Sequence, residues 1–219
     1  MDFAVSHWLC FGSSRSCGQC QIPVASNAAD VDFYSRRLSD RPQLVKEKMN
    51  IFLVSDNHGW YDDAVLKHAA TADEVWHAGD WLNLDLFHQL VNLGKPIRSC
   101  WGNVDGQDVR QIFPEHNKFT VEGVTVWLTH IAGKPGNYNP KIKAQLFADP
   151  PKLLVCGHSH ILKVERDTAL KNMIYVNPGS CGIQGFHLVR TALRFQLLAG
   201  KILNMEVIEF GPRVQKISV

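Results

Sequence analysis

The feature that most constrains this chain is a repeated pattern, in which short apolar runs end in residues that bind metal ions well. The clearest case is residues 50–59, where the apolar run 51–54 passes directly into Asp56 and His58. The run is typical of a buried strand, so both polar residues are expected in the loop at its carboxyl end. A carboxylate oxygen and an imidazole nitrogen are both ligands for divalent metals. Alone the pair is a weak signal, since a helix cap followed by a surface histidine has the same pattern.

Four further strand-like runs end in residues of the same kind. They end at Asp80, at Asn103, at His130, and at the pair His158 and His160. Each alone has an ordinary explanation, such as a turn or a hydrogen-bonded core histidine. In open α/β sheets, however, ligands bind beyond the carboxyl ends of the strands, so all seven residues are expected at one edge. Three or four such residues suffice for one metal ion and seven suit two, with Asp80 as the candidate bridging carboxylate.

The segments between these runs predict alternating helices and strands. Residues 62–72 and 84–93 carry apolar side chains at helical spacing, and Asn83 or Asp85 is the expected cap of the second helix. Further elements are expected as helices at 109–113 and 141–148, a hairpin over 119–128, a loop at 133–139 and mostly strands after 153. A βαβ pattern followed by antiparallel strands predicts an α/β sandwich with two facing sheets.

The first 48 residues differ from the rest, because no clear hydrophobic period runs through them. We interpret residues 1–48 as a disordered extension or as the product of a mis-assigned start, with Met49 as the true first residue. Cys17 and Cys20 could form half of a zinc or redox site, but no second pair lies near them in the sequence. The domain that carries the metal-binding residues is predicted to span residues 49–219.

Composition excludes several classes of function. A formal net charge of +2 over 219 residues argues against a stable nucleic-acid partner bound through broad charge neutralisation. No run of about 18 apolar residues is present, so neither a transmembrane helix nor a membrane partner is expected. The first residues lack the pattern of a secretory signal. The cysteines at 100 and 156 lie within apolar runs, which favours a reducing, cytoplasmic setting.

Taken in order, the motifs resemble those of the calcineurin-like metallophosphoesterase superfamily. They are Asp56-x-His58, Gly79-Asp80, Gly102-Asn103, His130 and Gly157-His158-x-His160. The short chain, the Gly-Asn-Val-Asp form at 102–105 and the Asn-Pro-Gly-Ser turn at 177–180 are similar to the small bacterial and archaeal phosphodiesterases of the superfamily. The resemblance covers residue 49 to the C-terminus. It implies a four-layer α/β/β/α sandwich.

The resemblance also implies how the ligands divide between two divalent metal ions. One ion would be held by Asp56, His58, Asp80 and His160, and the other by Asp80, Asn103, His130 and His158. Manganese is the expected ion, with iron, zinc and nickel as alternatives. Hydroxide bound by the two metals would attack phosphorus, and Asn103 and His130 would stabilise charge on the phosphate oxygens.

One position departs from the pattern of many superfamily phosphatases, which carry a histidine after the asparagine of the third motif. Here that residue is Val104, so the proton for the leaving group must come from elsewhere. This favours phosphodiesters with good leaving groups over alkyl monoesters. Asp105 is a weaker candidate for a direct role, and His77 is expected in the core or behind a ligand. Lys134 and Tyr138 are candidates for contact with the substrate.

The sequence therefore predicts a hydrolase, a metal-dependent phosphodiesterase acting on a small or nucleotide-like phosphodiester. One alternative is a phosphomonoesterase or protein phosphatase, which Val104 disfavours. The other is a non-catalytic protein-binding scaffold of the same fold, as in a small retromer subunit of the superfamily. A scaffold does not need all seven ligands, so their presence favours the enzyme. Whether the chain forms a homo-oligomer stays open.

Overall fold

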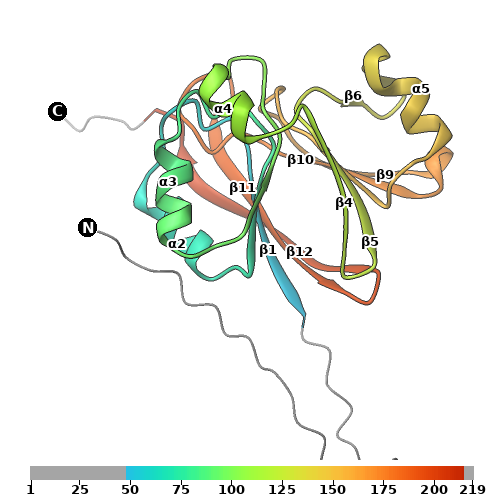
Figure 1. The fold of residues 1–219 in the computed structure, drawn as a ribbon, viewed down its shortest axis with the longest axis horizontal. Coiled ribbons are helices and arrows are strands. Elements are labelled where there is room, and N and C mark those ends of the chain that lie inside the picture. The colour runs from blue at the N-terminus through green and yellow to red at the C-terminus, as the bar shows by residue number, and fades with distance from the viewer. Residues whose placement is uncertain (1–47, 215–219) are drawn as a thin grey trace, which may run out of the picture. The chain divides into compact units, whose positions relative to one another are not determined.

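The fold is given by a computed structural model that describes residues 48–214. Two five-stranded sheets face one another, with helices on both outer sides (Figure 1). The four-layer α/β/β/α sandwich is thereby confirmed. The expected extension at 1–48, apart from Lys48, and the pair Cys17 and Cys20 lie outside the described residues. Within residues 48–214 no helix is long and apolar enough to cross a membrane.

The first sheet combines three parallel strands with an antiparallel pair. Its order is β12 (Lys201–Pro212), β11 (Val189–Leu198), β1 (Met49–Val54), β2 (Glu74–His77) and β3 (Ile97–Ser99). The parallel strands β1, β2 and β3 are connected through the helices α2 (Asp63–Ala70) and α3 (Asp85–Asn92). Strand β11 pairs antiparallel with β1 and with β12. This arrangement brings the carboxyl ends of β1, β2 and β3 to one edge.

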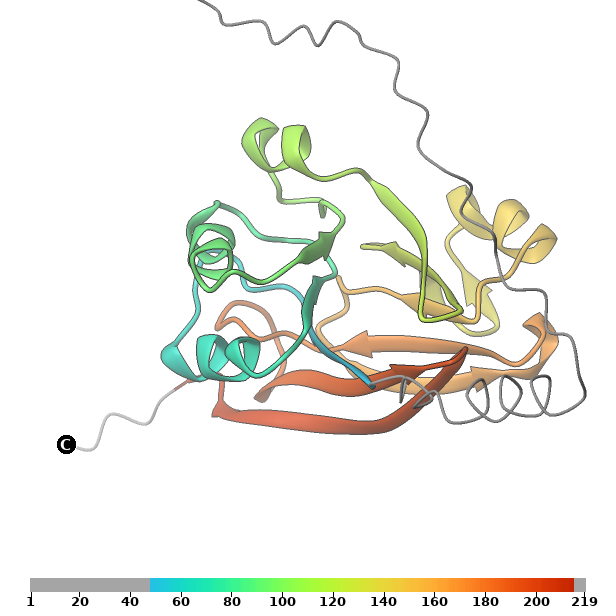
Figure 2. The ribbon, with the colours of Figure 1, turned by 60° about the horizontal axis from the view of Figure 1, so that its bottom comes forward.

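The second sheet has the order β4 (His116–Val121), β5 (Val124–Thr129), β8 (Leu153–Val155), β10 (Met173–Pro178) and β9 (Leu162–Asp167). Strands β5, β8 and β10 are parallel to one another. Helix α4 (Gln107–Ile112) precedes this sheet, and α5 (Pro140–Ala148) connects β5 to β8. Both views place α2 and α3 on one side of the two sheets and α5 on the opposite side (Figure 1, Figure 2).

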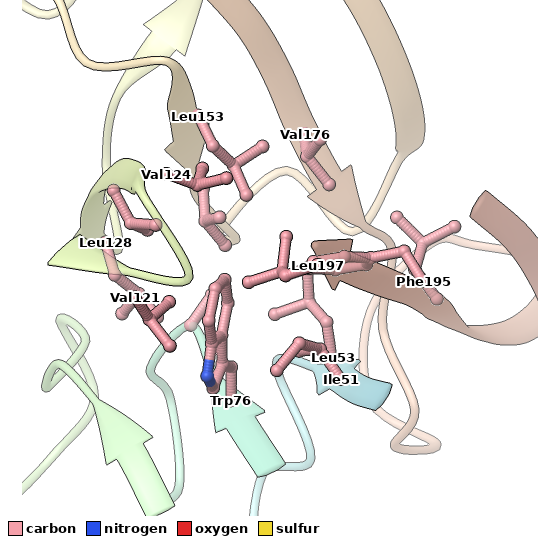
Figure 3. Close-up of a cluster of buried hydrophobic side chains, with 14 of the residues drawn as sticks. Ile51, Leu53, Trp76, Val121, Val124, Leu128, Leu153, Val176, Phe195 and Leu197 are labelled. Carbon is pink, nitrogen blue, oxygen red and sulfur yellow. The ribbon is translucent and has the colours of Figure 1, made fainter. Parts of the chain in front are cut away.

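The alternation of side chains along each strand explains the layers. On β1, Ile51 and Leu53 face the space between the sheets, where they pack with Trp76 and with side chains of the second sheet (Figure 3). The intervening Phe52 and Val54 pack against the helices α2, α3 and α4. A third cluster joins the outer face of the second sheet to α5. Three buried clusters thus hold the four layers together.

Two local expectations are corrected by the structure. Neither Asn83 nor Asp85 occupies the N-cap of α3, which is Leu84 and has no side-chain cap. Instead the Asn83 Oδ1 accepts the Asp85 backbone N–H at 3.1 Å. The segment expected as a loop at 133–139 contains a two-stranded ribbon, β6 (Gly133–Lys134) and β7 (Asn137–Tyr138). Gly136, with a φ of 83°, makes the turn that joins them.

Candidate metal centre

The seven residues expected to bind metal all lie just beyond the carboxyl ends of strands. They are Asp56 and His58 after β1, Asp80 after β2, Asn103 after β3, His130 after β5, and His158 and His160 after β8. Because β1, β2 and β3 are parallel and β5 is parallel to β8, these ends meet at one edge of the facing sheets. The structure brings all seven side chains together, each within 4.0 Å of another member of the set.

The backbone at this edge is strained. Five of the seven residues have a left-handed backbone, with φ angles of 55°, 46°, 60°, 68° and 57° at Asp56, His58, Asp80, His158 and His160. Non-glycine residues rarely adopt this conformation, which costs roughly 1–2 kcal/mol per residue. Such strain persists only where the surroundings impose it, and it gathers at functional sites. Here it turns side chains from separate loops toward a common point.

The first group, which we call the Asp56 group, consists of Asp56, His58 and His160. The Asp56 Oδ1 lies 3.2 Å from the His160 Nε2, and the Nε2 atoms of His58 and His160 are also 3.2 Å apart. The Asp56 carboxylate is held in place by the His158 backbone N–H, which lies 3.1 Å from both of its oxygens. Two imidazole nitrogens this close repel one another unless a proton or a cation lies between them. The geometry therefore fits a bound cation.

The second group, which we call the Asn103 group, consists of Asn103, His130 and His158. The Asn103 Oδ1 lies 2.8 Å from the His158 Nδ1 and 3.1 Å from the His130 Nε2. The His130 Nδ1–H donates to the Ala78 carbonyl at 2.7 Å, which leaves the lone pair of a neutral ring on Nε2. That lone pair faces the Asn103 oxygen and, at 3.2 Å, the Asp80 Oδ2. The Asn103 oxygen, the His130 Nε2 and the Asp80 oxygen thus converge on one point, and this arrangement also fits a cation.

Asp80 lies between the two groups. Its Oδ2 is 3.6 Å from the His58 Nε2 and 3.2 Å from the His130 Nε2. Its Oδ1 accepts the Val104 backbone N–H at 3.1 Å. A carboxylate in this position has one oxygen directed at both groups, which is the geometry that a bridging ligand needs.

The electrostatics differ among the candidate ligands. At His130 and His160 burial lowers the pKa, but the hydrogen bonds with Asp80 and Asp56 and the charges of these carboxylates outweigh burial and raise the pKa of both rings, so a metal ion would have to displace a proton from them. At Asp80 and His58 the shifts favour the forms that bind metal. Burial alone would raise the pKa of the Asp80 carboxyl, but the hydrogen bond to His130 and its charge outweigh burial and lower the pKa. Burial lowers the pKa of His58 even though the carboxylates of Asp80 and Asp56 oppose it. Asp80 is therefore ionised and His58 neutral near pH 7, and these are the forms that bind divalent ions.

Asp105 supports the site from behind and does not enter it. Its Oδ2 accepts the backbone N–H groups of Asp80 and Gly102 at 3.1 and 2.6 Å, and its Oδ1 accepts that of Leu82 at 2.8 Å. The side chain is buried, and burial raises the pKa of its carboxyl. Both oxygens are thus occupied by the loops that carry Asp80 and Asn103. A direct role for Asp105 in the reaction is therefore not supported.

His77 supports the loop after β1, in agreement with one of the two expectations from the sequence. Its Nδ1 accepts the Gly79 backbone N–H at 3.1 Å, so its Nε2–H donates to the Asn57 Oδ1 at 3.0 Å. The ring stacks on Trp81 with centroids 3.6 Å apart. Complete burial lowers the pKa of His77 well below its ordinary value. A neutral His77 thereby fixes Asn57, which lies between Asp56 and His58.

The loop that follows β10 contributes contacts that sequence reasoning missed. The Ser180 hydroxyl donates to the Asp56 carbonyl at 2.8 Å. Gly185 has a φ of 111°, and a Cβ at this position would overlap the His160 Nδ1. His187 packs against His160 with ring centroids 5.3 Å apart. The turn at 177–180 was visible in the sequence, but no pattern indicated that its continuation covers the Asp56 group.

Two cavities adjoin the Asn103 group. The apolar cavity, of about 320 Å³, includes His158, Ile131, Ile161 and Lys134 in its lining. The cationic cavity, of about 230 Å³, is lined by residues that follow β3 and β5 and by residues of α4, β4 and α5. They include Trp101, Asn103, Arg110, Glu115, His116, His130, Ile131 and Lys141. The expectation for Lys134 is thus compatible with the structure. The one for Tyr138 is wrong, because its side chain is buried and its hydroxyl donates to Asp167 at 2.5 Å.

A match to a known protein family covers the residues of this site. Residues 49–199 match the calcineurin-like phosphoesterase superfamily domain. The chain belongs to this superfamily. The match begins at β1 and spans all seven metal-binding candidates. No curated protein matches the chain.

Solved structures confirm the superfamily fold. A Thermotoga maritima protein is 25% identical, with a TM-score of 0.57 over 74% of this chain and 99% of that chain. An archaeal phosphodiesterase is 18% identical, with a TM-score of 0.55 over 73% of this chain and 100% of that chain. Vps29 of Entamoeba histolytica, complexed with Zn²⁺, is 15% identical, with a TM-score of 0.54 over 74% of this chain and 100% of that chain. At these identities the last two show the fold alone.

Proposed function

We propose that this protein is a metal-dependent phosphodiesterase that hydrolyses a small or nucleotide-like phosphodiester. The observation that carries the proposal is the presence of two adjoining ligand groups. The Asp56 group is one of them. In the other, Asp80 joins His130 and His158 of the Asn103 group. Within each of these two sets of three residues the ligand atoms lie within 4.8 Å of one another. Superfamily membership and the archaeal phosphodiesterase neighbour support the same reaction class.

The donor set suits two divalent ions. We propose that the Asp56 group with Asp80 holds one ion, and that the Asn103 group with Asp80 holds the other. Two such ions, when bound, lower the pKa of a water and supply hydroxide for attack on phosphorus. Manganese is the proposed ion, and iron, zinc and nickel are the alternatives; the Zn²⁺ complex of Entamoeba Vps29 supports a divalent ion on this fold.

The chain's own residues position the phosphate and determine the leaving group. With its Oδ1 directed at the two histidines, Asn103 can donate from its Nδ2 to a phosphate oxygen on which charge develops. Hydrolysis adds water, breaks one P–O bond and leaves a proton for the departing oxygen. Val104 has no proton to give from its side chain, and both oxygens of Asp105 are occupied by backbone N–H groups. This supports diesters with acidic leaving groups as substrates.

A second candidate function is that of a protein-binding scaffold. Its support comes from the structural neighbours named vacuolar protein sorting 29 and from two exposed apolar side chains near His160. Phe186 and Leu188 are 102% and 83% exposed and flank His187, which packs on His160. Because a Vps29 neighbour is itself complexed with Zn²⁺, the two functions are separated by whether hydrolysis accompanies metal binding.

The test is hydrolysis of bis(p-nitrophenyl) phosphate by metal-stripped protein, to which manganese, iron, zinc or nickel is added back. Activity should return with metal, should be lost in His130→Ala and should persist in the control His88→Ala, which changes an exposed histidine on α3. The rate on p-nitrophenyl phosphate should be lower, and a higher one would favour the monoesterase. Bound metal without hydrolysis by any of the four ions would contradict the proposal and favour the scaffold.

Compartment and partners stay predictions. We propose a cytoplasmic protein whose main partner is a small-molecule phosphoester, without a membrane partner and without a stable nucleic-acid partner. Sedimentation of the purified chain would decide between a monomer and a homo-oligomer. Location of the tagged full-length chain would test the compartment.

A further inference from the structure

The cationic cavity opens beside two members of the Asn103 group, Asn103 and His130. Two cationic side chains, Arg110 and Lys141, line it together with the His116 ring, whereas Glu115 is its single acidic lining residue. A cavity with this composition attracts an anion in addition to the phosphate that the metal centre itself would hold. The question is whether these cations are available to a ligand.

Arg110 is fixed in position but has no anionic partner among residues 48–214. Its Nε–H donates to the Asp105 carbonyl at 2.8 Å, and its guanidinium lies 4.3 Å from the Trp101 ring centroid. No carboxylate in the described part of the chain forms an ion pair with it. A guanidinium anchored through Nε and stacked on a ring keeps its terminal N–H groups for a ligand, and its planar fork matches a phosphate.

Lys141 lies across the cavity in the first turn of α5. Its backbone N–H donates to the Asn139 Oδ1 at 3.0 Å, while its ammonium has no ion-pair partner among residues 48–214. Burial lowers the pKa of His116, and the charges of Lys118 and Lys141 lower it further while Glu115 opposes them. Lys141 and His116 thus line the same cavity, and the lysine charge disfavours protonation of the neighbouring ring.

The apolar cavity offers a contrast on the other side of Ile131, which lines both cavities. Its two lysines are Lys134 and Lys163, and the Lys163 Nζ lies 2.6 Å from the Glu165 carboxylate. Its surface is otherwise mainly apolar. The two cavities thus flank the Asn103 group with different chemistry, and a phosphodiester has two ester groups to place in them.

We propose that the cationic cavity binds a second phosphate of the substrate, carried by the alcohol of one ester group, while the other ester group occupies the apolar cavity. The preferred substrate is then a phosphodiester that bears an additional phosphomonoester, with Arg110 and Lys141 as the residues that recognise it. This inference rests on the proposed phosphodiesterase function and specifies its substrate class.

Two matched substrates test the inference with the full-length, manganese-loaded protein. One is the p-nitrophenyl ester of thymidine 5′-phosphate, and the other is the same ester with a phosphate on the 3′ oxygen. We expect kcat/KM to be about tenfold higher for the second, as one or two charge-assisted hydrogen bonds would give. The preference should shrink as the salt concentration rises, because the cavity is open to solvent.

Variants assign the preference to this cavity. The ratio of the two kcat/KM values should fall toward one in Lys141→Gln and in Arg110→Gln. Because both values of a ratio are measured on the same protein, a change in the basal rate of a variant cancels. Lys143→Gln is the matched control, because Lys143 is on the same helix but lines neither cavity and packs near Phe147. Its ratio should equal that of the unaltered protein.

The outcomes separate the two proposals. If neither substrate is hydrolysed, the proposed function fails and the inference falls with it. If both are hydrolysed with equal kcat/KM, the phosphodiesterase stands and the second-phosphate site is wrong. If the preference survives in both Lys141→Gln and Arg110→Gln, the second phosphate binds elsewhere and the assignment to the cationic cavity is overturned.

Discussion

The two groups of the candidate metal centre have different surroundings. In the Asp56 group, the Asp56 side chain is fully buried, and the loop after β10 packs against it through Ser180 and against His160 through Gly185. In the Asn103 group, by contrast, Asn103 and His158 are exposed and two cavities open beside them. The substrate is therefore expected to enter from the Asn103 group, and the Asp56 group is built chiefly to hold its ligands in place.

The supports behind the two groups differ as well. A neutral, buried histidine, His77, fixes the Asp56 group through Asn57. A buried carboxylate, Asp105, fixes the loops of Asp80 and Asn103 through three backbone N–H groups. Each support can be altered without touching a metal-binding side chain. Substitutions at residues that serve both groups, or only one of them, therefore separate the two groups experimentally.

Asp80→Ala should have the largest effect, because this residue serves both groups. We expect kcat/KM for bis(p-nitrophenyl) phosphate to fall about a thousandfold or more, since the charge that faces both ion positions is lost. Asp85→Ala, which removes an exposed carboxylate on α3, is the control and should leave the rate unchanged. A loss of less than tenfold in Asp80→Ala would show that Asp80 does not join the groups.

Asp105→Asn should have the next largest effect and should act on Asp80 and the Asn103 group. An amide can accept with one atom only, so at least one of the three backbone hydrogen bonds is lost and a buried N–H faces an NH₂ donor. We expect a loss of about 10- to 100-fold in kcat/KM, as for other residues that orient ligands. Unfolding in urea should show a destabilisation of roughly 1–3 kcal/mol. Unchanged kcat/KM together with reduced stability would limit Asp105 to a purely structural role.

Gly185→Ala should affect the Asp56 group alone. The new Cβ would overlap the His160 Nδ1, so the His160 ring or the loop that carries residue 185 must shift and disturb the contact of His160 with Asp56. We expect roughly tenfold weaker binding of one of the two metal ions, and little change for the other. Gly94→Ala is the matched control, because Gly94 also has a positive φ, of 69°, but a Cβ added there would have no atom within 4 Å. Equal weakening of both ions in Gly185→Ala would contradict the separation into two groups.

The smallest predicted effect concerns His77 and pH. Its pKa in the folded protein is far below the ordinary value of about 6.5, so below that pH the unfolded chain binds a proton that the native chain does not. Stability should therefore fall as the pH falls below about 6.5, by up to roughly 1.4 kcal/mol per pH unit from this residue. Urea unfolding of metal-free protein between pH 7.5 and 5 should show a shallower decline in His77→Gln. An equally steep decline would contradict a neutral His77.

The seven metal-binding candidates could be predicted because they follow the carboxyl ends of five strands, and parallel strands bring these ends to one edge. The two facing sheets followed from the alternation of elements, whereas the four layers were implied by the resemblance to the superfamily. The covering of the Asp56 group by Gly185 and His187 could not be predicted, since it depends on how a loop far along the chain returns to β1. The cationic cavity likewise combines Arg110 with Lys141 from segments that no local pattern connects. Tyr138 was assigned wrongly because the sequence does not show which way its hydroxyl points.

The central claim is that one chain holds two metal ions, one at each group. The most direct measurement is the number of Mn²⁺ ions bound per chain, determined by equilibrium dialysis of the metal-stripped protein and its His160→Ala and His130→Ala variants. We predict two ions for the unaltered chain and one for each variant. A single ion in the unaltered chain, or two ions retained in both variants, would contradict the claim.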